Sequence, residues 1–416
     1  MLRKQMTSRE RVLAAIRHEE PDRLPVDLGA TPSSGISAIA YYNLKKHLQM
    51  EGVTRVYDVV QQVAQPEDAI LDKFRIDVVD IGRTFNTHPE DWHDFTLPQG
   101  MTVQFPAWFH PRPLEDQGWD VVDAEGYRIA YMPYGATFFD QTCFPYLDNY
   151  PADFKDLPYW MGKIHWSALV HSPWDHASEP DFWDQLRQKA IALRQSTDRA
   201  LVVVAGCNLF EWGTFLRRID NFLMDLASDQ ANVERLLDAL MEIHLQTLEK
   251  VCQAVGDVVD ILRFGDDLGS DLGPFMAPAT YRKLFKPRHA QLTKYVHENS
   301  QMKTFLHSCG SIYKLMPDLI DAGYDVINPV QISSRNMEPE RLKREFGKDI
   351  TFWGGGADTR FILNHATPEE VKDHVRRNIE ILSPGGGFVF NTVHNILGDV
   401  PPQNILAMFE AIDGFR

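Results

Sequence analysis

The feature that most constrains the fold is a repeated alternation of short β-prone runs with longer helical stretches. The runs occupy residues 24–28, 77–81, 201–205, 259–264, 303–307, 325–328, 350–353 and 387–390. Helix signals lie between the later runs. One is Thr367-Pro368-Glu369-Glu370, with threonine as N-cap, proline at the first helical position and glutamate reaching back. Eight strands that alternate with helices, without a long second sheet, favour a (β/α)8 TIM barrel over a doubly wound sheet.

We expect residues 1–416 to form a single TIM-barrel domain with two additions. Thr7-Ser8-Arg9-Glu10 is a capping box followed by apolar residues at helical spacing, which predicts an N-terminal helix over 7–20. The gap between the second and third runs is too long for one crossover, so an insertion between strands 2 and 3 is predicted at about 84–200. It carries seven of the nine tryptophans. Such an aromatic-rich segment can pack on its own aromatic residues, form a lid or wall over the barrel mouth, or do both.

Composition limits the partners and the compartment. The chain has 42 Lys and Arg against 58 Asp and Glu, a formal net charge of −16, and no basic cluster beyond short pairs such as Arg217-Arg218. This argues against a nucleic-acid or anionic-membrane surface. No apolar signal core and no window near eighteen apolar residues are present, so a cytoplasmic protein is expected. Four cysteines without paired spacing fit a reducing compartment. For the assembly of the protein, a homodimer is one option.

Polar residues gather where the predicted strands end, which is where TIM-barrel enzymes place their chemistry. The predicted catalytic residues are Asp27 after the first run, Glu211 after the third, and Asp266 and Asp267 after the fourth. The predicted substrate-binding residues are Asn208 and Trp212 after the third run, Asn328 after the sixth and Asn391 after the eighth. For Asp266 and Asp267, capping of a helix is the alternative.

His307-Ser308-Cys309 ends the fifth run. A strand projects alternate residues to one side, so the imidazole and the thiolate point the same way, as two ligands of a single metal would. A buried structural pair is the alternative. A metal site requires a third ligand from elsewhere in the chain.

Several of these segments resemble the uroporphyrinogen decarboxylase superfamily. They are Gly265-Asp266-Asp267-Leu268-Gly269, His307-Ser308-Cys309-Gly310-Ser311, Asn328-Pro329-Val330-Gln331, Trp353-Gly354-Gly355 and Val400-Pro401-Pro402-Gln403-Asn404-Ile405. The resemblance implies a TIM barrel. It also implies one of two activities, because the superfamily contains cofactor-free decarboxylases and zinc methyltransferases that work with a corrinoid. The shared fold does not decide between them.

Two features favour the methyltransferase branch. True uroporphyrinogen decarboxylases are expected to carry an arginine-rich segment after the first strand, because their substrate bears many carboxylates. Here no arginine lies between Arg23 and Arg55. In the loop after the last strand, His394 occupies the position at which the resemblance implies a third zinc ligand, usually cysteine. Two imidazoles and one thiolate leave zinc with a net charge of +1, a stronger Lewis acid than one imidazole with two thiolates, which suits an oxygen leaving group.

The sequence therefore predicts the demethylase component of a zinc-dependent methyltransferase, with zinc held by His307, Cys309 and His394. It would move a methyl group from a small organic methyl donor, an O-methyl compound, to a corrinoid (cobalamin). The corrinoid would be carried by a separate corrinoid-binding protein, because the chain shows no Asp-x-His-x-x-Gly signature. The alternative is a metal-free decarboxylase acting on a less charged carboxylate, with Asp27 or Asp266 as the acid-base group. A catalytically silent binding protein is the third interpretation.

Overall fold

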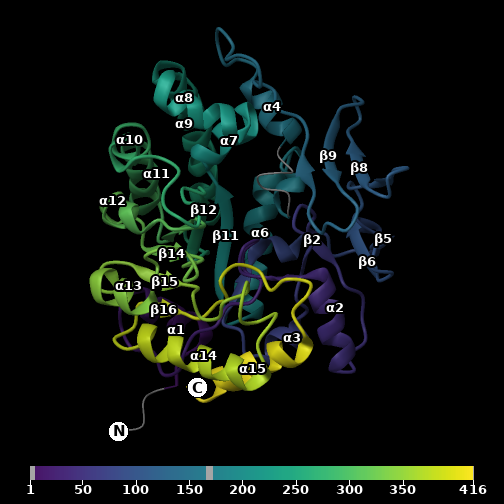
Figure 1. Cartoon of the computed structure of the whole chain (residues 1–416), viewed down its shortest axis with the longest axis vertical. Helices are drawn as coiled ribbons and strands as arrows, with labels where there is room; N and C mark the ends of the chain where they lie inside the picture. The colour runs from purple at the N-terminus through teal and green to yellow at the C-terminus, as the bar shows by residue number, and fades with distance from the viewer. Residues whose placement is uncertain (1–4, 165–171, 416) are drawn as a thin grey trace.

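The computed structural model describes residues 5–164 and 172–415 (Figure 1). Its central element is a seven-stranded sheet in the order β16-β15-β14-β13-β12-β11-β4, in which all neighbours are parallel. The strands are β4 (Val78–Asp80), β11 (Ala200–Gly206), β12 (Ile261–Gly265), β13 (Lys303–His307), β14 (Val326–Asn328), β15 (Thr351–Trp353) and β16 (Phe388–Val389). Each coincides with one of the predicted β-prone runs.

The first predicted run bridges the two edges of this sheet. The backbone N–H of Asp27 donates to the carbonyl of Phe390 at 2.9 Å, and the N–H of Phe390 donates to the carbonyl of Pro25 at 2.9 Å. On the other side, the N–H of Asp77 donates to the carbonyl of Val26 at 2.8 Å. Residues 24–28 thus form an isolated parallel bridge at Val26 and not a regular strand. The sheet is curled, in agreement with a TIM-like barrel.

Helices follow most of the strands and bury one face against the sheet (Figure 1). They include α6 (Phe182–Ser196), α7 (Phe210–Arg217), α8 (Ile219–Ser228), α9 (Gln230–Val255), α10 (Pro278–Leu284), α11 (Lys286–Asn299), α12 (Met316–Asp321), α13 (Pro339–Phe346), α14 (Pro368–Leu382) and α15 (Pro402–Asp413). Helix α14 begins at the predicted Thr367 and Glu370 capping box. It buries Val371, Val375 and Ile379, which share one helical face.

Helix α1 (Ser8–Ile16) also begins with its predicted capping box, formed by Thr7 and Glu10. It ends at Ile16 and not at residue 20, because the chain turns at His18, whose φ is +58°. Val12, Ala15 and Ile16 pack with Val202, Ile261, Phe305, Trp353 and other residues of the sheet strands. Ile261 on β12 and Phe305 on β13 belong to this packed group. Arg263 follows Ile261 by two positions and His307 follows Phe305 by two, so Arg263 and His307 project to that same face of the sheet.

Between β4 and β11 the chain forms antiparallel strands and further helices. The strands are β5 (Trp92–Thr96), β6 (Thr102–Pro106), β7 (Arg112–Pro113), β8 (Trp119–Val122), β9 (Arg128–Met132) and β10 (Asp140–Gln141), and α4 (Leu157–Ile164) follows. Strands β5 and β6 pair with each other, and the other four form the sheet β10-β9-β8-β7. Phe105, Phe109 and Phe139 form the centre of a separate apolar cluster. That cluster also contains Ile39 and Val56.

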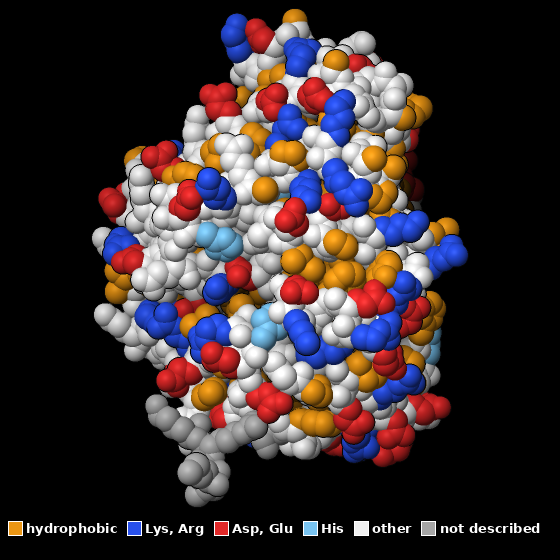
Figure 2. Space-filling view, turned by 90° about the vertical axis from the view of Figure 1, so that its left-hand side faces the viewer, with side chains coloured by type: hydrophobic (Ala, Val, Ile, Leu, Met, Phe, Trp, Pro, Cys, Tyr) orange, Lys and Arg blue, Asp and Glu red, His pale blue; other side chains and the backbone are white. Residues whose placement is uncertain are grey.

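A small antiparallel sheet precedes β4 in the chain. It contains β1 (Ile36–Ser37), β3 (Val63–Ala64) and β2 (Val56–Asp58), with α2 (Ala38–His47) and α3 (Asp68–Lys73) nearby in sequence. On the face shown in Figure 2, Lys and Arg side chains are interspersed with Asp and Glu. Within the described part of the chain, no helix combines the length and the apolar character that crossing a membrane requires.

Candidate metal centre

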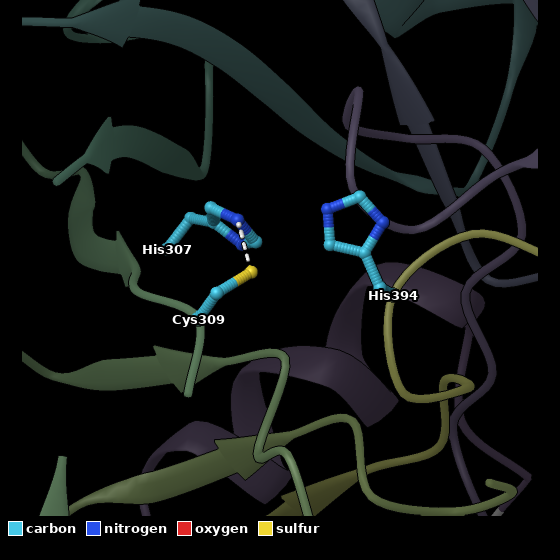
Figure 3. A group of neighbouring side chains, drawn as sticks. All are labelled: His307, Cys309 and His394. Atoms are coloured by element: carbon cyan, nitrogen blue, oxygen red, sulfur yellow. Dashed lines mark hydrogen bonds between the residues drawn. The ribbon is translucent and has the colours of Figure 1, made fainter. Parts of the chain in front are cut away.

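Three side chains that can bind a metal meet at the carboxyl end of the parallel sheet. Each of His307, Cys309 and His394 offers a ligand atom, and these atoms lie within 4.8 Å of one another. His307 Nε2 and Cys309 Sγ are 3.4 Å apart, and the rings of the two histidines have centroids 5.3 Å apart. Figure 3 shows the His394 ring facing the other two side chains from a different loop. This is a group of nitrogen and sulfur ligands of the kind that zinc takes.

The local sequence explains how His307 and Cys309 are held. His307 is the last residue of β13, paired with Gly265 of β12 and Asn328 of β14. The backbone N–H of Cys309 donates to Asp267 Oδ1 at 2.8 Å. Gly310 follows with φ +80°, and a Cβ at this position would lie 2.3 Å from the carbonyl oxygen of Gly269. The glycine after the cysteine is therefore required for the two strand-end loops to approach each other.

Asn328 orients the His307 ring. The Nδ1–H of His307 donates to Asn328 Oδ1 at 2.6 Å, and the Asn328 amide is fixed by its own donation to the Trp353 carbonyl at 2.8 Å. With the proton on Nδ1, the lone pair of Nε2 points at the sulfur of Cys309. Burial, with the nearby Arg263 charge, lowers the pKa of His307 to about 3. The ring is thus neutral at pH 7, which is the form that binds a metal.

His394 would bind a metal as a neutral imidazole, whereas Cys309 would have to give up its proton. His394 lies in the loop after β16 with φ +65°, a strained conformation for a non-glycine residue. Its Nδ1 accepts the N–H of Asn395 at 2.9 Å, so the neutral ring carries its proton on Nε2. Burial, followed by His307, lowers the pKa of His394 to about 3. Burial and the nearby Asp267 and Glu211 raise the pKa of the Cys309 thiol, so metal binding would release its proton.

Two of the predicted carboxylates lie beside these ligands. Asp267 Oδ1 is 3.5 Å from His307 Nε2, and its side chain is 37% exposed. Glu211, in the first turn of α7, accepts a hydrogen bond from Asn208 Nδ2. Burial, together with repulsion from Asp267 and Asp266, raises the pKa of Glu211 to about 8. Glu211 therefore holds a proton at neutral pH and can act as an acid.

The other two predicted carboxylates bind protein groups. Asp266 accepts the backbone N–H groups of Phe210 and Glu211 at 3.0 and 2.9 Å, so it caps α7, which is the alternative that the sequence left open. His289 Nε2 contacts the same carboxylate at 3.0 Å. Asp27 accepts from Trp353 Nε1 at 2.9 Å and from the N–H of Ala30 at 3.0 Å. Burial raises the pKa of Asp27 to about 6.

The predicted substrate-binding residues are all buried: Asn208, Trp212, Asn328 and Asn391. The Asn391 amide donates to the carbonyls of Asp27 and Ser34, whereas its Oδ1 has no partner among the described residues. Trp212 packs edge-on against Phe215. A role of these four residues in binding a substrate stays a prediction.

Sequence analysis missed Arg263, which lies inside β12. Its side chain is 6% exposed, and its Nη2 donates to Ser33 Oγ at 3.3 Å. Ser33 in turn donates to Asn328 Oδ1 at 3.2 Å, so Arg263 is connected to the partner of His307. A charged residue two positions after a buried isoleucine in a fully buried strand was the signal that could have revealed it.

A cavity of about 440 Å³ opens beside His394. It is lined by residues that include Ser37, Ile39, Gln61, Phe138, Asn395 and Leu397. The cavity is large enough for a small organic molecule and gives it access to His394.

Comparisons with known proteins agree with this architecture. The family model for uroporphyrinogen decarboxylase (URO-D) matches residues 208–415, which contain all three candidate ligands. A uroporphyrinogen decarboxylase from Methylococcus capsulatus (strain ATCC 33009 / NCIMB 11132 / Bath) is 29% identical over 97 residues, 23% of this chain and 26% of that protein. The match thus spans about a quarter of the length of that relative.

Among solved structures, a methyltransferase from Methanosarcina mazei has a TM-score of 0.58 at 15% identity and covers 99% of both chains. A B12-independent methionine synthase from Shewanella sp. W3-18-1 has a TM-score of 0.34 at 15% identity, over 55% of this chain and 66% of that chain. The second likeness is too weak to define a shared fold. The chain belongs to the uroporphyrinogen decarboxylase family, as its sequence motifs predicted.

Proposed function

We propose that this protein is the demethylase component of a corrinoid-dependent methyltransferase. It would take a methyl group from a small O-methyl compound and give it to a corrinoid carried by a separate protein. The observation that carries the proposal is that the possible ligand atoms of His307, Cys309 and His394 lie within 4.8 Å of one another. In addition, the hydrogen bond to Asn328 holds the proton of His307 on Nδ1 and leaves Nε2 free for a metal. The likeness in fold to a methyltransferase over 99% of both chains supports it.

The donor set fits zinc, because two imidazole nitrogens and one sulfur are common zinc ligands and three protein ligands leave a position for substrate. Zinc held there would act as a Lewis acid toward the oxygen that bears the methyl group. The two surrounding carboxylates have distinct roles in the proposal. Asp267 holds the backbone N–H of Cys309 and so fixes the loop that carries the sulfur.

Glu211 supplies the proton that the reaction needs. The methyl group leaves its donor without the electron pair of the C–O bond, which stays on the oxygen. Because the pKa of Glu211 is raised to about 8, its carboxyl is protonated at pH 7 and donates to that oxygen. Asp266 caps the helix on which Glu211 lies, so it acts as a positioning residue.

The test is methyl transfer from a panel of O-methyl compounds to reduced cob(I)alamin, followed by absorbance and by zinc analysis of the same samples. The proposal predicts transfer by protein that contains zinc and loss of transfer in the His307→Ala and Cys309→Ala variants. No transfer from any donor, with a zinc-free protein that does not bind added zinc, would overturn it.

Metal-free decarboxylation is the second candidate, favoured by the family to which the chain belongs and by the buried cation Arg263, which could hold a carboxylate. Here Glu211 would protonate the carbon from which CO₂ leaves. Release of CO₂ from carboxylate substrates by zinc-free protein would support this function. The His307→Ala variant should then keep its activity.

A further inference from the structure

Arg263 is a buried cation for which the protein supplies few partners. It lies on β12 between Ile261 and Gly265 and projects to the same face as Ile261, which packs with Phe305 and Trp353 inside the curled sheet. Its side chain is only 6% exposed. A guanidinium removed from water is costly unless its N–H groups are paired with acceptors, so its partners show what the site is built to hold.

Those partners are incomplete. Nη2 donates to Ser33 Oγ at 3.3 Å, and Nε has no acceptor among the described residues. Glu211, Asp267 and Asp58 influence Arg263 through space, and none of them is within ion-pair distance of its nitrogens in the described part of the chain. Asn208 Oδ1 also has no hydrogen-bond partner among the described residues. Gly265 leaves room beside this pair of side chains, because a Cβ on Gly265 would lie 2.9 Å from both Asn208 Nδ2 and Arg263 Nη1.

A hydrogen-bonded path places this guanidinium beside the candidate metal centre. Arg263 donates a hydrogen bond to Ser33 Oγ, and Ser33 Oγ donates to Asn328 Oδ1 at 3.2 Å. The same Asn328 Oδ1 accepts a hydrogen bond from His307 Nδ1 at 2.6 Å. The mouth above is open to solvent, because Glu211, Asp267, Cys309 and His394 are only half-buried. A ligand bound by Arg263 would therefore lie on the side of the site where Ser33 and Asn328 position His307.

We propose that Arg263 forms an anion subsite that binds a carboxylate of the substrate, so that the methyl donor is an organic acid that also carries the O-methyl group. Arginine pairs with a carboxylate through parallel N–H donors. Nη1 of Arg263 has no acceptor among the described residues and can donate to such a group, whereas the Nε–H is shielded from solvent and reaches a ligand only if its neighbours shift. The carboxylate would anchor one end of the molecule and leave its methyl-bearing end toward His307. This inference rests on the proposed function for the identity of the reaction, but the subsite itself can be tested without it.

The competing explanation is that Arg263 only offsets the negative charge of Asp267. The two explanations differ in what they predict for ligand binding. An anion subsite discriminates a carboxylic acid from its neutral amide of the same shape, whereas a charge that serves the protein alone does not.

Isothermal titration calorimetry on the purified full-length protein at pH 7 makes this comparison with two matched pairs: methoxyacetate against methoxyacetamide, and 3-methoxybenzoate against 3-methoxybenzamide. In at least one pair the acid should bind about 10- to 100-fold more tightly, the range expected for one charge-assisted hydrogen-bond pair. Arg263→Gln should abolish the preference and Arg263→Lys should keep part of it. Arg187→Gln, which removes an arginine paired with Asp257 on the outer surface, should leave it unchanged.

If Arg263→Gln does not fold, Gly265→Ala tests the same site, because the added methyl would press on Nη1 at 2.9 Å and should weaken binding of the acid. The proposal is wrong if wild-type protein shows no preference in either pair, or if the Arg263 and Gly265 variants keep the full preference. Methyl transfer from the same four compounds to cob(I)alamin separates the two claims. Preferred binding of acids without transfer would refute the proposed function alone, and transfer from the amides as fast as from the acids would refute the subsite alone.

Discussion

Replacing Asn328 by alanine should weaken metal binding and lower the stability of the fold by amounts that follow from its contacts. The substitution leaves the Nδ1–H of His307 and the carbonyl of Trp353 without their partners, and both groups are buried. Each orphaned buried group costs about 1–3 kcal/mol, so the free energy of unfolding should fall by about 2–6 kcal/mol. Loss of a hydrogen bond that orients a metal ligand typically lowers metal affinity by about 10- to 100-fold.

The matched control is Asn328→Asp. A carboxylate keeps the acceptor for His307 but can no longer donate to the Trp353 carbonyl, so stability should fall while zinc affinity is kept or rises. Chemical denaturation measures the first quantity, and competition with a chromophoric chelator measures the second. If Asn328→Ala binds zinc as tightly as the wild type, Asn328 does not set the ligand form of His307, and the account of the site is wrong at that point.

Four further outcomes are expected. His394→Cys should keep zinc but slow methyl transfer by about two orders of magnitude, because a thiolate lowers the net charge of the site and about 3 kcal/mol of leaving-group stabilisation would be lost; equal rates would refute the charge argument. Wild-type methyl transfer should decline as the pH rises through about 8, where Glu211 loses its proton, and Glu211→Gln should remove that limb of the profile along with most of the activity. For Asp27, burial raises the pKa from near 4 to about 6, so the folded state keeps a proton that the unfolded state has lost. Asp27 should therefore contribute a fall of about 3 kcal/mol in the free energy of unfolding between pH 4 and 6, and Asp27→Asn should lower the slope of the denaturation series by that amount. Gly310→Ala should disrupt the loop at Cys309 and reduce zinc content, which metal analysis after dialysis would report.

The strands were predictable because their signal is local. Fully buried parallel strands appear as short apolar runs between helices, and the run at 303–307 matches β13 at both ends. The first run was less predictable as a regular strand. Residues 25–27 are held by hydrogen bonds to Phe390 and Asp77, which come from distant parts of the chain, so their conformation depends on closure of the sheet.

The grouping of three possible ligands was predictable from residue type and strand position for His307 and Cys309, and from the family resemblance for His394, which lies in a loop. The roles of the amide side chains and of the helix-capping carboxylate were harder to predict. A substrate contact of Asn328 stays a prediction. What its sequence position did not reveal is that its amide pairs with His307 and Trp353, because that pairing depends on the register between β13, β14 and β15. Arg263 was missed because an isolated charge inside an apolar run gives no local sign of what it faces.

The central claim is that these three residues hold one zinc ion. X-ray absorption at the zinc edge of purified wild-type protein tests it most directly, because the technique reports the metal content and its nearest atoms together. The account predicts about one zinc per chain bound to one sulfur and two imidazoles, with one imidazole missing in the His394→Ala variant. Protein that neither contains nor takes up zinc, or a zinc site whose spectrum is unchanged in His394→Ala, would contradict it.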